Sequence, residues 1–156
     1  MRGHLTNGAC VVSADSQDLH INMGQYSTHD FTEVGDTSTP GIPFTIRLTE
    51  CYSGLKVGVG VTFSGLTDPK EPDLFLVKAS DAPPTGVSGQ NGFTGLGLLI
   101  IDQNGHQMMP SSMPNKFFSP DGQNISLHYV ARYKATSRRV WPGELRTEVN
   151  FDISYP

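Results

Sequence analysis

The chain has 156 residues, with 11 basic and 15 acidic side chains and a formal net charge of −4, a size that suits one domain with one core. No basic run is longer than Arg138-Arg139, so we do not expect binding to nucleic acid. No stretch of about 18 apolar residues occurs, so we do not expect a membrane-spanning segment. The 17 glycines and 11 prolines are spread along the chain, which favours many turns between short strands.

The N-terminal region is short of apolar residues until the first cysteine. Residues 1–9 contain no apolar core of a signal peptide, so we expect a mature or trimmed form with an added first methionine. Cys10 begins an extended segment that we expect to run to Met23, with Leu19 and Ile21 on the same face as Met23.

Two cysteines, Cys10 and Cys51, lie at or near the ends of strand-like segments. They are either two buried thiols or one disulfide, and a β-rich composition typical of secreted proteins favours the disulfide. Such a bond would close a loop of roughly forty residues and contribute about 3–4 kcal/mol in the chain-entropy model.

The next two segments alternate between apolar and polar residues. Pro43 can open a strand over Phe44–Cys51, because proline is tolerated at a strand's start and not inside a central strand. A second strand is expected over Leu55–Phe63. Its other face is left bare by Gly58 and Gly60, which permits the close approach of another backbone.

Three further strands are expected before the C-terminal segment. Leu74–Val77 is apolar on both faces and is therefore expected to be covered on both. Phe93–Ile101 leads into Asn104-Gly105, a strong turn signal, and the proline-containing residues 106–122 predict an irregular connection. Ile125–Tyr133 alternates again.

The last fourteen residues show the longest alternation in the chain. The intervening residues are polar at every step, so we expect one continuous strand with one buried and one exposed face. The buried set is Gly143, Leu145, Thr147, Val149, Phe151, Ile153 and Tyr155.

No segment of ten or more residues has the apolar spacing of a helix, and no linker divides the chain. Short strands separated by turns predict a single all-β sandwich domain spanning residues 1–156.

The sequence predicts no catalytic, metal or cofactor site. The five histidines include no pair with metal-ligand spacing, no nucleophile elbow occurs, and no catalytic carboxylate pair can be singled out among the scattered acidic residues. Gly92–Gly97 leads into a strand, whereas a phosphate-binding loop requires a helix N-terminus.

Taken together and in order, these segments resemble the subunits of chaperone–usher pili, the type 1 fimbrial protein family. Such subunits have a penultimate tyrosine and a glycine fourteenth from the end, here Tyr155 and Gly143. Further matching segments are Gly8–Ser13, Phe44–Cys51, Val61–Gly65, Gly95–Gly105 and Tyr129–Ala135. The general likeness is greatest to a minor tip or adaptor subunit.

The resemblance implies an incomplete immunoglobulin-like β-sandwich that lacks its final strand and has one disulfide, between Cys10 and Cys51. It also implies an N-terminal extension of alternating apolar residues. Residues 1–9 are shorter than that extension, so we interpret them as its truncated remnant, with Gly3 and Leu5 at alternate positions.

The implied function is that of a structural subunit of an adhesive bacterial pilus. The implied partners are a periplasmic chaperone, neighbouring pilus subunits and the outer-membrane usher, with no cofactor, and the implied location is a surface fimbrium reached through the periplasm. A donated strand would fill a groove between the first and last strands. The residues expected to form the groove are Val12, Leu19, Ile21, Gly143, Leu145, Val149, Phe151, Ile153 and Tyr155.

Two alternatives stay open at this stage. The last strand could belong to an ordinary sandwich whose edge is covered by the chain's own loop. The domain could also be a secreted immunoglobulin-like module that binds a host glycan or receptor as a tip adhesin, through Trp141 or the tyrosines.

Overall fold

The structure is a computed structural model that describes most of the chain. The described residues are 2–4, 10–17, 23, 26–39, 41–51, 58–79, 93–114, 117–119, 123–137, 140 and 145–155. All statements below refer to these residues.

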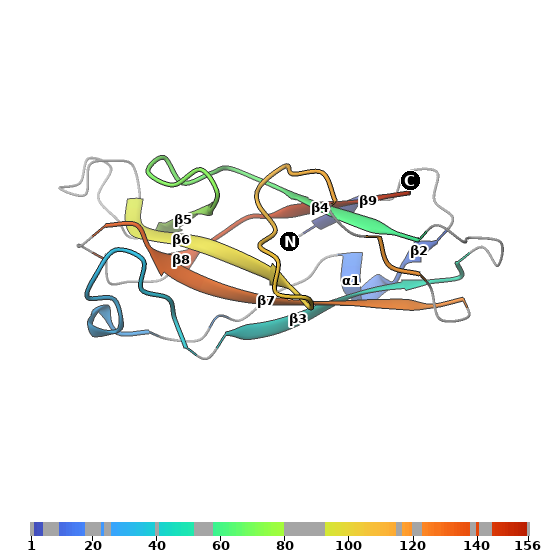
Figure 1. Cartoon of the computed structure of the whole chain (residues 1–156), viewed down its shortest axis with the longest axis horizontal. Coiled ribbons are helices and arrows are strands. Elements are labelled where there is room, and N and C mark those ends of the chain that lie inside the picture. Colours follow the sequence, from blue (N-terminus) through green and yellow to red (C-terminus); the bar gives the residue numbers. More distant parts are fainter. Residues whose placement is uncertain are drawn as a thin grey trace.

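The described strands form two sheets, and the regular secondary structure of the described residues is almost all β (Figure 1). One sheet has the order β1 (Arg2–His4), β9 (Asn150–Ser154) and β4 (Gly60–Ser64). The other has the order β2 (Val11–Val12), β3 (Ile42–Thr49), β7 (Ile125–Ala135), β6 (Phe93–Asp102), β5 (Phe75–Ala79) and β8 (Leu145–Arg146). The helical elements described are the short α1 (Ala14–Gln17) and η1 (Thr28–Asp30).

Aromatic side chains from both sheets meet in one core. Phe63 of β4 lies edge-on to Tyr129 of β7, with ring centroids 5.0 Å apart, and Phe44 of β3 stacks on Tyr129 at 5.4 Å. Phe151 of β9 contacts Phe63 at 6.4 Å. Further along β7, burial raises the pKa of Tyr133 to about 12, so this phenol stays neutral at physiological pH.

The alternation in the sequence is confirmed in the long strands. Every second residue of β7, from Ile125 to Ala135, is buried. The expected turn at Asn104-Gly105 follows β6, where the Gly105 amide donates to the Asp102 carbonyl. Pro43 lies exposed near the start of β3, where, among the described strands, β7 alone pairs with β3.

The first expected strand is wrong in length. β2 covers only two residues, and α1 follows where an extended segment to Met23 was expected. The Ser13 amide donates to the Arg47 carbonyl, and the Ser16 hydroxyl accepts from the Arg47 amide at 2.8 Å. A serine side chain therefore replaces the next step of the β2–β3 ladder and lets the backbone turn into a helix.

The last expected strand is broken in two and changes sheet. β8 pairs with β5 at Ala79↔Leu145, whereas β9 pairs with β4. Side-chain alternation persists across the crossing, since Val149 is buried between exposed Glu148 and Asn150. Alternation of apolar and polar residues indicates which face of a sheet each side chain lies on, but not which strand its backbone pairs with. The crossing between the sheets therefore could not be predicted from the sequence.

The face of β4 that glycine leaves without side chains has a close neighbour, as expected. This neighbour is residues 108–114 and 117–119, which we call the cover segment. A Cβ on Gly58 would lie 2.9 Å from the Phe118 carbonyl oxygen, and one on Gly60 would lie 2.7 Å from the Pro114 side chain. Val59 and Phe118 exchange two backbone hydrogen bonds of 2.8 Å, so this segment also closes the outer edge of β4.

Candidate functional site

The middle strand of the smaller sheet, β9, has unequal neighbours on its two sides. On one side β4 runs antiparallel to it and pairs with all of its residues, from Gly60↔Ser154 to Ser64↔Asn150. On the other side β1 runs parallel to it, and within the described residues this pairing covers Asn150–Asp152. The described part of the β1 ladder therefore covers three of the five residues of β9.

The inward face of β9 is apolar and deeply buried. Val149, Phe151 and Ile153 are each 3% exposed or less. Across the ladder, Phe63 of β4 is the register partner of Phe151, and Val61 is that of Ile153. This apolar face belongs to the strand that pairs with β1.

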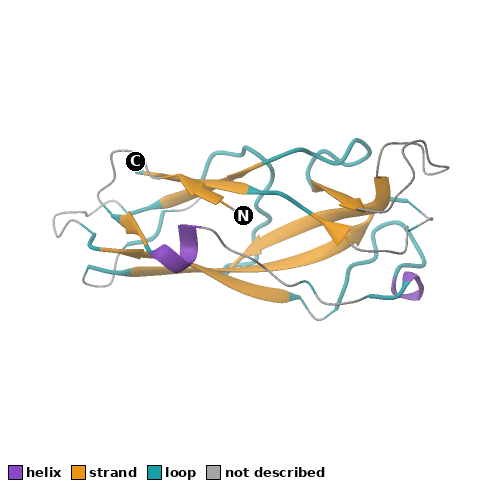
Figure 2. Ribbon diagram, turned by 180° about the vertical axis from the view of Figure 1, so that it is seen from behind, coloured by secondary structure: helices purple, strands orange, loops and turns teal. Residues whose placement is uncertain are grey.

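The sequence resemblance implied that a strand is missing beside the last strand of the chain, and β1 lies in part of that position. It lies at the edge of β9, and α1 lies beside both β1 and β3 (Figure 2). The chain's own N-terminal residues thus lie between its first segment and its last strand. One alternative left open by the sequence was that the chain itself covers the edge of its last strand. Within the described residues, β1 covers that edge at Asn150–Asp152.

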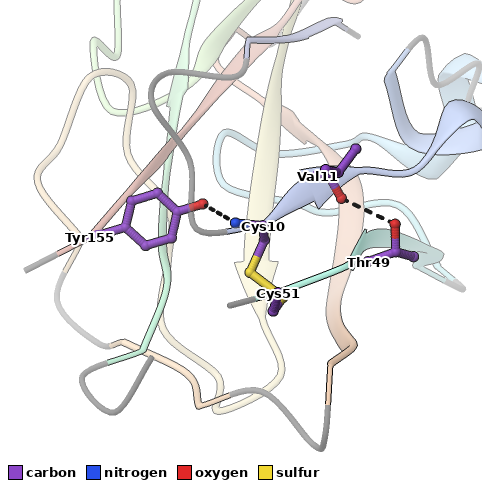
Figure 3. Close-up of a disulfide and its surroundings, with 5 residues drawn as sticks. All are labelled: Cys10, Val11, Thr49, Cys51 and Tyr155. Carbon is purple, nitrogen blue, oxygen red and sulfur yellow. Dashed lines mark hydrogen bonds between the residues drawn. A yellow bond between two sulfur atoms is a disulfide. The ribbon is translucent and has the colours of Figure 1, made fainter. Parts of the chain in front are cut away.

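The far end of β9 is tied to the start of β2. The Cys10 amide donates a hydrogen bond to the Tyr155 hydroxyl at 3.1 Å (Figure 3). Cys10 is bonded to Cys51, so the expected disulfide is present. These contacts connect the penultimate residue of the chain to the end of β3 in the other sheet.

The structure brings together most of the residues that the sequence assigned to a groove. Val12, Val149, Phe151 and Ile153 belong to one buried cluster, against which Leu145 and Tyr155 pack. Val12 and Leu145 lie in the larger sheet, in β2 and β8. The expected residues Leu19, Ile21 and Gly143 lie outside the described residues.

Sequence reasoning missed the β1 residues and the β4 partners of β9. The placement of Gly3 and Leu5 at alternate positions was a signal for an N-terminal strand, but three residues are too few for a periodic pattern. Val61 and Phe63 carried a strand signal without any sign that their partner would be β9.

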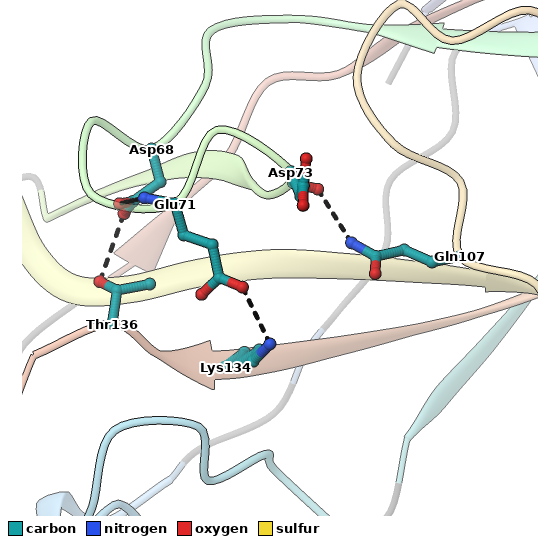
Figure 4. A network of polar contacts seen from close by, with 6 residues as sticks. All are labelled: Asp68, Glu71, Asp73, Gln107, Lys134 and Thr136. Atoms are coloured by element: carbon teal, nitrogen blue, oxygen red, sulfur yellow. Dashed lines mark hydrogen bonds and ion pairs between the residues drawn. The ribbon is translucent and has the colours of Figure 1, made fainter.

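A polar cluster lies elsewhere, where the residues before β5 meet β7 (Figure 4). Asp68 accepts hydrogen bonds from the Lys70 and Glu71 amides, and Glu71 pairs with Lys134 at 3.0 Å. These contacts satisfy a turn and join it to β7, which is a structural arrangement. Among the described residues, no group of three metal-ligating side chains occurs, and no helix has the length and apolar character to cross a membrane.

Comparison with known proteins identifies the family. A family model described as "Fimbrial protein" matches residues 1–156. The chain belongs to the fimbrial protein family.

Curated relatives of this fimbrial protein align along nearly all of its length. The putative fimbrin-like protein FimI of Salmonella typhi is 36% identical over 157 residues, covering 100% of this chain and 83% of that protein. The fimbrial subunit type 1 of Salmonella typhimurium is 34% identical over 155 residues, covering 98% and 79%.

Solved structures share the fold. The P pilus rod subunit PapA is similar with a TM-score of 0.75 at 24% identity, covering 96% of this chain and 100% of that one. A chaperone–usher pilus structure is similar with a TM-score of 0.73 at 23% identity, covering 100% and 93%. The fimbrial protein is therefore a structural pilus subunit with a pilin-type immunoglobulin-like fold. It is not an enzyme; it assembles with neighbouring subunits into a pilus on the cell surface.

Proposed function

We propose that the β1-side edge of β9 is a strand-acceptor site, through which this subunit is completed by a strand from another polypeptide. The observation that carries the proposal is that the ladder with β4 spans the whole of β9, whereas the ladder with β1, within the described residues, spans Asn150–Asp152. Chaperone–pilin donor-strand complementation is an established example of such strand addition to a sheet edge.

The other edge of the same sheet supports this choice of site. The cover segment closes β4 with the chain's own backbone, through Val59, Phe118 and the Ser111 amide that donates to the Phe63 carbonyl. An exposed strand edge beside apolar residues is an aggregation hazard, which proteins normally avoid. A subunit that closes one edge permanently and the other only briefly is suited to receive a strand at the second.

Burial of the partner's own apolar side chains beside β9 would supply the driving force for strand addition. The neighbouring residues Val149, Phe151 and Ile153 are already buried. Each apolar side chain that a partner strand buries fully would contribute about 1.5–3 kcal/mol. The cost of ordering the partner reduces that sum. A strand with four or five alternating apolar residues would therefore bind firmly.

The order of partners follows from this exchange. A periplasmic chaperone first supplies the strand, and the N-terminal extension of a neighbouring subunit replaces it at the outer-membrane usher. Each subunit then accepts one strand and donates another, which is a head-to-tail contact that builds an open filament on the cell surface. The groove residues are Val12, Leu19, Ile21, Gly143, Leu145, Val149, Phe151, Ile153 and Tyr155. The position as a minor tip or adaptor subunit remains a prediction of the sequence resemblance.

A peptide experiment tests the site. The probe is a twelve-residue peptide that alternates valine and threonine, and its control is the same composition in scrambled order. We expect the alternating peptide to form a one-to-one complex and to raise Tm by roughly 5–10 °C at a hundredfold excess over Kd. Equal effects of the two peptides would count against strand addition.

A matched pair of variants locates the peptide on β9. Ile153→Val and Ile100→Val each remove one methylene from a buried isoleucine, in β9 and in β6. Both should lower the free energy of unfolding by about 0.5–1.5 kcal/mol. Only Ile153→Val should also lower the affinity for the peptide, by about two- to tenfold. The same affinity loss in both variants would place the peptide elsewhere.

A further inference from the structure

The turn that follows β6 contains an asparagine followed directly by a glycine, Asn104-Gly105. Both residues are exposed to solvent, and nothing lies within 4 Å of the position that a Cβ on Gly105 would occupy. We propose that Asn104 is a site of spontaneous deamidation, and that Asp102 controls how fast the reaction proceeds. This proposal concerns a chemical modification of the subunit and does not depend on the strand-acceptor site.

The reaction needs no other reagent than water. The Gly105 nitrogen attacks Cγ of the Asn104 side chain and closes a five-membered succinimide ring. The bond between Cγ and Nδ2 breaks, and the proton of the Gly105 amide leaves with the side-chain nitrogen as ammonia. Water then opens the ring at either carbonyl, which gives aspartate or isoaspartate at this position. Glycine suits the second position because it has no Cβ to crowd the attacking nitrogen.

Hydrogen bonds to Asp102 hold the turn in a conformation that the reaction has to leave. One carboxylate oxygen of Asp102 accepts from the Asn104 amide at 2.9 Å and from the His106 amide at 2.8 Å. The Asp102 carbonyl accepts from the amide of Gly105, which is the attacking group, at 3.1 Å. The ring closes only when the Gly105 amide gives up this acceptor and the backbone at Asn104 rotates. Asp102 is therefore a positioning residue that slows the reaction without taking part in it.

The isoaspartate product changes the backbone just before the cover segment. Isoaspartate continues the chain through its side chain, so it inserts one extra carbon atom into the main chain between Asp102 and His106. In the unmodified turn the Asp102 amide donates to the His106 carbonyl at 2.9 Å, and the Met108 amide donates to the Ile100 carbonyl at 2.8 Å. An added atom moves these donors and acceptors out of alignment. Met108 begins the cover segment, so the modified subunit holds that segment less firmly.

Peptide mapping by mass spectrometry tests the site. The folded chain is incubated in mildly alkaline buffer, and an isoaspartate-specific methyltransferase assay accompanies the mass measurement. We expect conversion at Asn104 and none at Asn124, which is also exposed but precedes the branched Ile125. Two more pairs of this kind, Asn7-Gly8 and Asn91-Gly92, lie outside the described residues, so each asparagine is scored separately. An unchanged Asn104, or equal conversion at Asn104 and Asn124, would overturn the proposal.

Two variants test the role of Asp102. Asp102→Ala removes the acceptor of the Asn104 and His106 amides, so conversion at Asn104 should be about two- to tenfold faster in the folded chain. Asp102→Asn keeps an oxygen acceptor in the same place and should retain the rate of the unmodified chain. In urea all three proteins should convert at one rate, faster than the folded unmodified chain, because the turn is not formed. Equal rates for the folded and the unfolded unmodified chain, or for the three folded proteins, would overturn the control by Asp102.

A matched pair of proteins tests the consequence for the cover segment. Asn104→Gln keeps an exposed carboxamide, but its side chain is one methylene longer, so the corresponding ring has six members and closes far more slowly. Both proteins are incubated in the alkaline buffer, and Tm is measured before and after. Once Asn104 is fully converted, the Tm of the unmodified chain should fall by about 2–4 °C more than that of Asn104→Gln. Equal changes in Tm would overturn the expected loosening of the cover segment.

Discussion

Two hydroxyl groups on the last part of the chain are buried without a hydrogen-bond partner among the described residues, those of Thr147 and Ser154. Thr147 lies where the chain crosses from β8 in one sheet to β9 in the other. The sequence placed it on the apolar face of a continuous strand. Its burial agrees with that placement, but the crossing leaves its hydroxyl without a partner.

We expect Thr147→Val to stabilise the protein by about 1 kcal/mol. The substitution keeps the shape of the side chain and removes a buried hydroxyl that makes no hydrogen bond, which lifts a desolvation cost. Urea denaturation measures the change. Thr147→Ser is the matched control, since it keeps the hydroxyl, loses a methyl group and should not stabilise. A destabilised valine variant would show that the hydroxyl has a partner after all.

At the scale of elements, the crossing of the cover segment over β4 depends on glycine. Gly58 has a φ of +90°, and Gly60 is the register partner of Ser154 in β9. Both are positions where a Cβ would meet the cover segment, and at Gly58 the obstacle is backbone. The segment could not close the β4 edge in its present path if either residue carried a side chain.

We expect Gly58→Ala to lower the free energy of unfolding by about 2–3 kcal/mol. About 1–2 kcal/mol of this comes from placing alanine in the left-handed region, and the rest from contact with the Phe118 carbonyl. Gly105→Ala is the control, since Gly105 has a φ of +85° but nothing lies within 4 Å of its Cβ position. Thermal unfolding of both variants gives the comparison. Equal losses would mean that the crossing adds no constraint.

The elements also show what a sequence can predict. The strands β3 and β7 follow from alternation, because each has one face on the core and enough residues to establish a period of two. The strand β6 follows from its apolar run and the turn signal at Asn104-Gly105. The bare face of β4 predicted a close backbone neighbour, which the cover segment provides. These are properties that a segment carries in its own residues.

The remaining features depend on partners distant in the chain. α1 forms because the Ser16 hydroxyl takes over the Arg47 amide, 31 positions away. The β8–β9 crossing depends on which strand each half pairs with, and β1 is too short to show a pattern. In the candidate site, alternation predicted that Val149, Phe151 and Ile153 are buried, but not that Gly3 would face Phe151 across a parallel ladder.

At the scale of the whole molecule, one small cluster holds the two sheets together at the end of β9. Cys10 is bonded to Cys51 beyond the end of β3, and its amide donates to Tyr155 beyond the end of β9. Cys10 is thus held from both sheets at once. The hydrogen bond depends on the disulfide, because the bond fixes where the Cys10 amide lies.

We therefore expect the two contacts to be coupled in a double-mutant cycle. Removing the disulfide with Cys10→Ala and Cys51→Ala opens a loop with a sequence separation of 41 and should cost about 3–4 kcal/mol. Tyr155→Phe should cost about 1 kcal/mol when the disulfide is present, because a buried amide loses its acceptor. Without the disulfide the same change should cost less, by about 0.5–1 kcal/mol.

Urea denaturation of the four proteins gives the coupling free energy. Tyr26→Phe serves as the control in a parallel cycle, because Tyr26 packs against the rings of Phe31 and Tyr133. Its cost should be the same with and without the disulfide. If Tyr155→Phe were equally additive, the two sheets would be joined at this end by independent contacts. Cys10 would then not be the point through which the last strand and the disulfide stabilise each other.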